Sequence, residues 1–244
     1  MTDLSGQTIV VIGGSAGIGL ETARLARAGG AEVVLTGRGE ERLKAAADEI
    51  GATATAAFDV AEPDRLEQFL AGLPEPIDHV LVTAGRPLYG LFADLDFAEV
   101  GSHVAEHVLL PMRVGRAAIG RIRPGGTLLF MSGTGGRRPG PGMTVIGTVT
   151  AALPALVANL AVELAPIRVN LIAAGFVDTP LSAELRGDNL DRRREALRDT
   201  LPIGRVVGPA DVGALAVHLM VNTALTGTTF DIDGGQQLVP SWAG

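Results

Sequence analysis

The chain has 244 residues, of which 47% are apolar and 19% are charged, and its formal net charge is −7. This composition predicts a packed globular protein rather than a disordered or fibrous one, and the acidic balance argues against a nucleic-acid partner. Because the chain contains no cysteine, disulfides, thiolate zinc sites and iron–sulfur clusters are excluded.

The N-terminus has no basic stretch and runs directly into an apolar segment, so we expect no signal peptide and a cytoplasmic protein. From there, short β-branched runs alternate with Ala- and Leu-rich stretches of helical period, which predicts repeated β-α-β units. The predicted strands are Thr8 to Ile12, Glu32 to Thr36, Thr53 to Phe58, His79 to Thr83, Thr127 to Met131, Arg168 to Ile172 and Thr228 to Ile232. The predicted helices cover residues 17–29, 40–49, 63–71, 95–121, 144–164 and 209–221.

This order predicts a single α/β domain over residues 1–244, with a Rossmann-type, doubly wound, parallel seven-stranded sheet and helices on both faces. Ligands of such sheets bind at the carboxyl ends of the strands. The longest stretch without a strand, Ala173 to Pro209, follows the sixth strand and predicts a substrate lid over residues 174–208. Inside it, Arg192, Arg193 and Arg194 lie among acidic residues and predict a solvated, mixed-charge helix face.

The segment Pro139 to Val162 has no charged residue and is long enough to cross a bilayer. Its Pro-Gly-Pro-Gly start cannot form a regular helix, and we expect Pro154 to interrupt the remainder. A helix that is apolar all round is more often buried in a core or a subunit interface. The sequence therefore predicts no membrane span here.

A glycine-rich turn follows the first predicted strand and leads directly into the first predicted helix. This strand, turn and helix match the dinucleotide fingerprint in its Gly-x-x-x-Gly-x-Gly form, in which backbone amides and the helix N-terminus bind a pyrophosphate. The turn predicts these cofactor-binding residues: Gly13, Ser15, Ala16, Gly17, Ile18 and Gly19.

The end of the second predicted strand indicates which dinucleotide is bound. NAD-binding domains usually present an acidic residue there for the ribose hydroxyls, but this strand ends in Leu35-Thr36-Gly37-Arg38. The planar guanidinium of Arg38 can pair with a 2′-phosphate, which a carboxylate would repel. The sequence thus favours NADP(H) over NAD(H).

Nearly the whole chain resembles the short-chain dehydrogenase/reductase family. Besides the glycine turn, the matching segments are Asp59-Val60, Val82 to Gly85, Ala174 to Pro180, Pro209 to Val212, Thr226-Gly227 and Asp231 to Gly235. The resemblance implies a nicotinamide cofactor and a carbonyl or alcohol substrate. It further implies that the cofactor contacts these residues: Asp59, Val60, Ala84, Gly85, Val177 and Thr179.

The four groups on which the family's chemistry depends are replaced. In this register Gly133 stands at the catalytic serine, with Ser132 beside it, Ile146 at the tyrosine, Thr150 at the lysine and His107 at the supporting asparagine. A shifted register cannot restore the motif, because the chain has a single tyrosine, Tyr89, and a single lysine, Lys44. Isoleucine cannot exchange a proton, and a threonine hydroxyl carries no fixed charge.

His107 and Ser132 are the remaining candidates for catalysis. His103 and His107 share one face of the long predicted helix, and an imidazole at the crevice could act as a general acid. Three arginines border the same region as candidate anion contacts: Arg86, Arg137 and Arg138. The run His103 to His107 also spells His-x-x-Glu-His, but no third zinc ligand accompanies it, so we predict no metal site.

Three functions remain open at this stage. The first is a divergent NADP(H)-dependent oxidoreductase acting on a small molecule with a non-standard proton donor. The second is a cofactor-binding protein without hydride transfer, acting as a sensor or a structural partner. The third is a non-redox enzyme that uses the same crevice. The resemblance also implies a homodimer or homotetramer.

Overall fold

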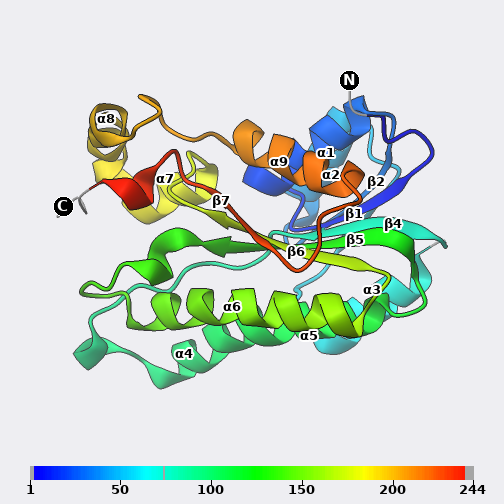
Figure 1. Cartoon of the computed structure of the whole chain (residues 1–244), viewed down its shortest axis with the longest axis horizontal. Coiled ribbons are helices and arrows are strands. Elements are labelled where there is room, and N and C mark those ends of the chain that lie inside the picture. Colours follow the sequence, from blue (N-terminus) through cyan, green and yellow to red (C-terminus); the bar gives the residue numbers. More distant parts are fainter. Residues whose placement is uncertain (1–2, 74, 240–244) are drawn as a thin grey trace.

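Seven parallel strands form one sheet in the order β3-β2-β1-β4-β5-β6-β7 in the computed structural model, which describes residues 3–73 and 75–239 (Figure 1). The strands are β1 (Thr8–Ile12), β2 (Glu32–Gly37), β3 (Ala54–Ala57), β4 (Ile77–Val82), β5 (Ile122–Gly133), β6 (Arg168–Ala174) and β7 (Thr229–Ile232). The helices are α1 (Gly17–Ala28), α2 (Glu40–Ile50), α3 (Pro63–Gly72), α4 (Phe97–Val104), α5 (Leu110–Ala118), α6 (Thr144–Glu163), α7 (Pro180–Arg186), α8 (Leu190–Thr200) and α9 (Pro209–Val221).

Helices cover both faces of the sheet and create two apolar cores. The first core lies between the sheet and α1, α2 and α9, and the second lies between the sheet and α3, α5 and α6 (Figure 1). Strands β4 and β6 are buried along their whole length, which explains why their second halves are continuously apolar rather than alternating. The predicted doubly wound fold is confirmed.

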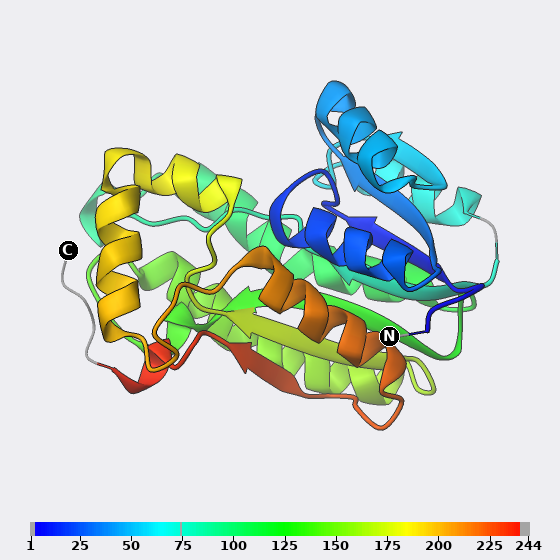
Figure 2. The same cartoon turned by 90° about the horizontal axis from the view of Figure 1, so that it is seen from above.

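The order of the strands reverses beside β1, which pairs with β2 on one side and with β4 on the other. The chain first proceeds outward to β3 and then returns to β4, so the loops that follow β1 and β4 leave the sheet in opposite directions (Figure 2). In open α/β sheets the ligand crevice forms at this reversal, outside the carboxyl ends of the strands.

The long helix predicted over residues 95–121 is divided. A π-helical segment, Ala105–Leu109, separates α4 from α5. Pro111 explains the irregularity, because it offers no amide to the carbonyl of His107 and its ring crowds that carbonyl. His107 therefore lies in a widened turn, a feature that is frequent at functional sites.

The predicted lid is more ordered than a loop. The stretch between β6 and α9 contains α7 and α8, which stand over the carboxyl edge of the sheet (Figures 1 and 2). The prediction of a solvated mixed-charge face on α8 is wrong at Arg193, which is buried. Arg193 is only 9% exposed, with its guanidinium over the ring of Phe176, and Arg194 pairs with Asp178.

Helix α6 is continuous from Thr144 to Glu163, so the predicted interruption at Pro154 is wrong. A single proline removes one helical hydrogen bond, here to the carbonyl of Thr150, and packing of the helix can offset this loss. Although α6 is long and apolar enough to cross a membrane, it lies along β5 and β6 and buries Leu153 and Val157 in the second core. It is a core helix of the domain.

Candidate cofactor site and active site

The glycine turn lies at the strand reversal and is packed too tightly for side chains. A β-carbon on Gly19 would lie 2.3 Å from the carbonyl oxygen of Gly13, and Gly13 and Gly17 have φ angles of +96° and +55°. The N-cap of α1, Ala16, has no side-chain hydrogen bond, and the first turn of the helix has no acidic residue. The N-terminal amides of α1 are thus not capped by a side chain, an arrangement that fits a pyrophosphate.

The residues predicted to contact the adenosine half lie at the ends of β2 and β3. Arg38 follows β2, is exposed and forms no ion pair within the described part of the chain. Asp59 accepts a hydrogen bond from the amide of Ala61 at 2.9 Å and stands beside the half-buried Val60. Ser15 is buried against Gly37, where a β-carbon on the glycine would lie 3.0 Å from the serine Oγ. All of these residues border one end of the crevice.

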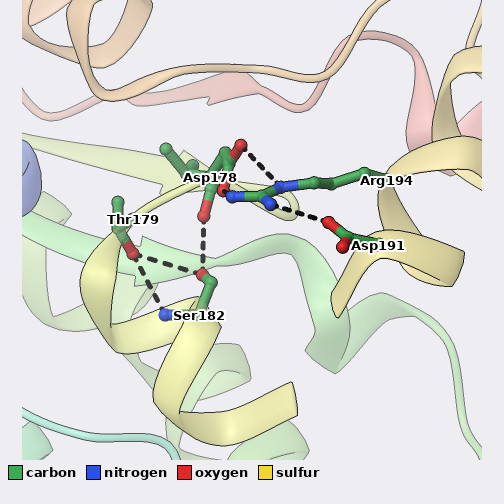
Figure 3. Close-up of polar contacts among 6 residues, drawn as sticks. Asp178, Thr179, Ser182, Asp191 and Arg194 are labelled. Carbon is green, nitrogen blue, oxygen red and sulfur yellow. Dashed lines mark hydrogen bonds and ion pairs between the residues drawn. The ribbon is translucent and has the colours of Figure 1, made fainter. Parts of the chain in front are cut away.

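The opposite wall comes from the segment after β6. A β-carbon on Gly17 would lie 3.5 Å from the side chain of Thr179, so the structure brings the glycine turn and this predicted contact together. Thr179 caps α7 by accepting the amide of Ser182 at 3.2 Å, and Ser182 Oγ donates to the carbonyl of Val177 at 2.6 Å (Figure 3). These bonds fix the loop that the family resemblance assigns to the nicotinamide. Ile18, predicted in the turn itself, lies in the first turn of α1 and packs on the first core.

The positions of the family's catalytic serine and lysine adjoin each other, as the register requires. A β-carbon on Gly133 would lie 3.8 Å from Cγ2 of Thr150, in ordinary contact, so the space there would accept a serine. Thr150 is 6% exposed and its hydroxyl donates to the carbonyl of Ile146 at 2.7 Å. Ile146, at the tyrosine position, is 7% exposed. Neither residue has a group available for acid–base chemistry.

His107 lies on the π-helical segment, which packs against α6, the helix that carries Ile146 and Thr150. Its Nδ1 donates to the carbonyl of His103 at 3.0 Å, which leaves Nε2 as the acceptor nitrogen. A β-carbon on Gly85, whose φ is +131°, would lie 3.4 Å from that Nε2. The absence of a side chain at Gly85 therefore lets the imidazole lie against the backbone that follows β4.

The two histidines are in ring contact, with centroids 4.0 Å apart. Burial lowers the pKa of His107, and the hydrogen bond to His103 and the charge of Glu106 partly oppose that change. Burial, followed by the neighbouring His107, lowers the pKa of His103 to about 4, while a hydrogen bond to the backbone of Arg86 raises it. Both imidazoles are therefore neutral at pH 7.

Ser132 lies on the same face of β5 as Phe130, toward α5 and α6. Its Oγ is enclosed and forms no hydrogen bond with the residues that the structure describes. A cavity of about 20 Å³ lies nearby, bordered by Glu106, His107 and Phe130, and this volume has room for one water molecule. A role for Ser132 in orienting a substrate stays a prediction.

Ion pairs that the sequence did not reveal hold the segment between β6 and α9. Arg194 of α8 binds Asp178 through two hydrogen bonds of 2.7 and 2.9 Å, and also contacts Asp191 at 2.9 Å (Figure 3). Arg86, after β4, binds Glu184 of α7 at 2.9 Å. The pair of Arg194 joins the loop after β6 to α8, and the pair of Arg86 joins the loop after β4 to α7.

The three arginines expected to contact an anion are all engaged with protein groups. Besides the pair of Arg86, Arg137 pairs with Asp231, with one contact of 2.6 Å, and Arg138 donates to the carbonyl of Gln237. Each of these contacts joins segments far apart in the sequence. Part of each guanidinium is thus committed to these contacts, and a ligand would bind through the remaining N–H donors.

Comparison with known proteins shows similarity along almost the whole chain. A family model described as enoyl-(acyl carrier protein) reductase matches residues 13–237. The short-chain dehydrogenase/reductase ATR9 of Stachybotrys chlorohalonatus is 30% identical, over 96% of this chain and 98% of its own. The structure of the MalC reductase/Diels–Alderase of Malbranchea aurantiaca matches with a TM-score of 0.90 and 25% identity, over 96% of this chain and 98% of its own. BdcA in complex with NADPH matches with a TM-score of 0.84 and 27% identity, over 94% of each chain.

Proposed function

The chain belongs to the short-chain dehydrogenase/reductase family, and on that premise we propose that it is an NADP(H)-dependent oxidoreductase in which His107 handles the proton. The substrate is a small molecule that contains a carbonyl group or the corresponding alcohol. The observation that carries the proposal is the fixed imidazole, with Nδ1 bound to the carbonyl of His103 and Nε2 against Gly85 at the crevice.

The cofactor would be held along the carboxyl edge of the sheet, and when bound it supplies or accepts the hydride. The amides from Gly13 to Gly19 would bind its pyrophosphate, Asp59 and Val60 its adenine, and the backbone at Ala84 and Gly85 its central part. Val177 and Thr179 would hold the nicotinamide. The closeness of Gly17 and Thr179 supports this assignment, because one cofactor molecule could then contact both the glycine turn and the loop after β6.

His107 has the geometry of a general base in the direction of alcohol oxidation. Its Nε2 carries the free lone pair, because the proton on Nδ1 is committed to the carbonyl of His103. In carbonyl reduction the same nitrogen must first take up a proton and then give it to the substrate oxygen. The small cavity beside Glu106 could hold the water through which that proton exchanges with solvent.

The test of the reaction follows NADPH absorbance with a panel of ketones, quinones and aldehydes, after cofactor binding has been measured separately by calorimetry. Saturable oxidation of NADPH by at least one carbonyl compound is expected. Tight NADPH binding without turnover of any carbonyl or alcohol would contradict the proposal.

Arg38 carries the preference for NADP(H). Its exposed guanidinium, which forms no ion pair in the described part of the chain, can pair with a 2′-phosphate through two hydrogen bonds. Arg38→Ala is expected to weaken NADPH binding by about 10- to 100-fold, because charge-assisted hydrogen bonds contribute about 1.5–3 kcal/mol, and to leave NADH binding almost unchanged. Dissociation constants of both nucleotides check this. Equal affinities of the wild-type protein for NADPH and NADH would exclude the preference.

A non-redox reaction in the same crevice is the second candidate. The observation that favours it is the loss of acid–base capacity at Ile146 and Thr150, both of which are buried. The solved structure of MalC is described as that of both a reductase and a Diels–Alderase, so the two kinds of reaction are named together for one similar protein. Whether NADPH is consumed when a purified substrate is converted separates the two candidates: an oxidoreductase consumes NADPH, and a non-redox enzyme does not.

We also propose a homodimer or homotetramer. The outer surface of α4, the π-helical segment, α5 and α6 carries exposed apolar side chains: Val104, Leu109, Met112 and Val162. Exposed apolar side chains that gather into a patch are typical of interaction sites, and we propose that these residues take part in one. Multi-angle light scattering is expected to return a multiple of the 25.1 kDa chain mass, and a monomer mass at micromolar concentration would contradict the proposal.

A further inference from the structure

A small cavity lies where the π-helical segment between α4 and α5 meets the carboxyl ends of β4 and β5. Its volume of about 20 Å³ has room for one water molecule. Most of its wall is apolar and includes Val82, Ala84, Phe130 and Met131. The polar side chains in the wall are those of Glu106 and His107, which are neighbours in the widened turn. A water molecule at this point would therefore have these two side chains as hydrogen-bond partners.

The cavity adjoins the backbone against which the imidazole of His107 lies. Nδ1 of His107 is committed to the carbonyl of His103 at 3.0 Å, so Nε2 is the nitrogen that can exchange a proton with a substrate. A β-carbon on Gly85 would lie 3.4 Å from this Nε2, and the preceding residue, Ala84, borders the cavity. The cavity and Nε2 thus meet at the same short segment, Ala84-Gly85, just after β4.

Glu106 borders the cavity and is also partly exposed to solvent, because the residue is only half-buried. Its carboxylate forms no ion pair with the residues that the structure describes. The arginine that follows β4, Arg86, pairs with Glu184 instead. A carboxylate between a water-sized cavity and solvent can accept a hydrogen bond from the enclosed water and can exchange protons with the solvent.

Glu106 is also the charged side chain that acts on His107. Burial lowers the pKa of His107, and the hydrogen bond to His103 and the negative charge of Glu106 oppose that change. The other groups around the imidazole supply no further negative charge. His103 has a pKa of about 4 and is neutral at pH 7, and the charge of Arg86 is balanced by its ion pair. Helix α6, which packs against the π-helical segment, has no charged residue before its last position (Figure 1).

We propose that Glu106 is a positioning residue for His107: its carboxylate holds one water molecule in the cavity and returns protons through this water to the imidazole. In carbonyl reduction, the N–H bond at Nε2 of His107 breaks as an O–H bond forms on the substrate oxygen. The neutral imidazole then takes a proton from the water, and the water regains a proton that Glu106 has taken from solvent. The inference rests on the proposed function, because it names the group that reprotonates His107.

The pKa of His107 tests this link without turnover. We would follow the 13Cε1 resonances of labelled histidine during a pH titration of the 244-residue chain, with and without NADPH. The chain has four histidines, and the resonance of His107 is the one that is lost in His107→Ala. The titration is repeated in Glu106→Gln, in Glu106→Asp and in the matched control Glu99→Gln. Glu99 is an exposed glutamate of α4 that forms no ion pair in the described chain.

The pKa of His107 should fall in Glu106→Gln, because a neutral amide does not stabilise the imidazolium, and should stay at the wild-type value in Glu99→Gln. Glu106→Asp, which keeps the charge, should lie between them.

Kinetics give the second readout, with a carbonyl compound that the protein reduces. Glu106→Gln should lower kcat/KM at pH 7 by about ten-fold, which is less than the loss of a general acid itself causes. Small buffer acids such as acetic acid or imidazolium should raise kcat of this variant as their concentration increases, because they deliver the proton that Glu106 no longer supplies. The wild-type protein and Glu99→Gln should not respond. A merely structural role of Glu106 would not produce this dependence on buffer.

The same pKa of His107 in Glu106→Gln and Glu99→Gln would overturn the inference, and so would a Glu106→Gln variant whose kcat does not depend on buffer. The outcome is separable from that of the proposed function. If no carbonyl compound oxidises NADPH but the pKa of His107 still falls in Glu106→Gln, the reaction is wrong and the link between the two side chains stands. If a ketone is reduced and His107→Ala is inactive, but Glu106→Gln behaves as Glu99→Gln does, the proposed function stands and the role of Glu106 is wrong.

Discussion

Replacement of His107 by alanine is expected to lower kcat/KM for carbonyl reduction by about 10²- to 10⁴-fold, the usual contribution of a positioned general acid or base. The buried Ile146 and Thr150 cannot substitute for it. Its nearest titratable neighbour, His103, has a pKa of about 4 and uses its carbonyl to hold His107. The affinity for NADPH should change little, because the proposed role of the imidazole is toward the substrate and not toward the cofactor.

The control for this substitution is His218→Ala, since His218 is exposed on α9 and contacts only Asn222, at 3.2 Å, among the described residues. That variant should retain wild-type kinetics. Added imidazole should restore part of the activity of His107→Ala by filling the vacated space. If His107→Ala kept more than a third of the wild-type kcat/KM, the proposed role of His107 in proton transfer would be wrong.

The pH profile gives the same prediction a second readout. Burial places the pKa of His107 below its ordinary value of about 6.5. Reduction needs the protonated imidazole, so log kcat/KM should fall with a slope near −1 as pH rises above that pKa, and the reaction should be fastest in acid. Alcohol oxidation needs the neutral imidazole, so kcat/KM for oxidation should rise with pH and reach a plateau before pH 7. His107→Ala should lose this dependence in both directions.

The cofactor crevice could be predicted from the sequence because its requirements are local. Gly13 and Gly17 have positive φ angles, and any larger residue at Gly19 would collide with the turn. Such demands select glycine at fixed spacing, and the strand and helix on either side can be recognised from their hydrophobic period. The seven strands follow for the same reason, with differences only at their ends.

The surroundings of the active site depend on contacts that the sequence does not encode locally. Arg86 and Glu184 lie 98 residues apart, and Arg194 and Asp178 lie 16 apart, so neither pair follows from a helical or strand period. The buried position of Arg193 was likewise hidden within a run of charged residues. The π-helical segment had a local signal in Pro111, four residues after His107, but α6 continues through Pro154, so a proline alone does not predict where a helix is interrupted.

Arg168→Met is expected to reduce the free energy of unfolding by about 3 kcal/mol or more, although Arg168 lies far from the crevice at the start of β6. Arg168 is 5% exposed. Its guanidinium donates to five backbone carbonyls, those of Gly125, Leu219, Met220, Asn222 and Leu225, at 2.6–3.3 Å. Four of these carbonyls belong to the last turn of α9 and the turn that follows it, where a helix has no amides of its own to offer.

Methionine fills a similar volume but donates no hydrogen bond, so the substitution isolates the lost donors from a loss of packing. For a chain of this size the expected change lowers the melting temperature by roughly 6–12 °C. The stability of Arg168→Lys should lie between those of the wild type and Arg168→Met, because lysine keeps the charge but has fewer donors. The control Arg198→Gln, at an exposed position of α8, should stay within about 0.5 kcal/mol of the wild type. Because the loop with Val177 and Thr179 directly follows β6, loosening the start of this strand should also weaken NADPH binding. A methionine variant that melts with the wild type would show that water satisfies these carbonyls equally well and that β6 is held by the sheet alone.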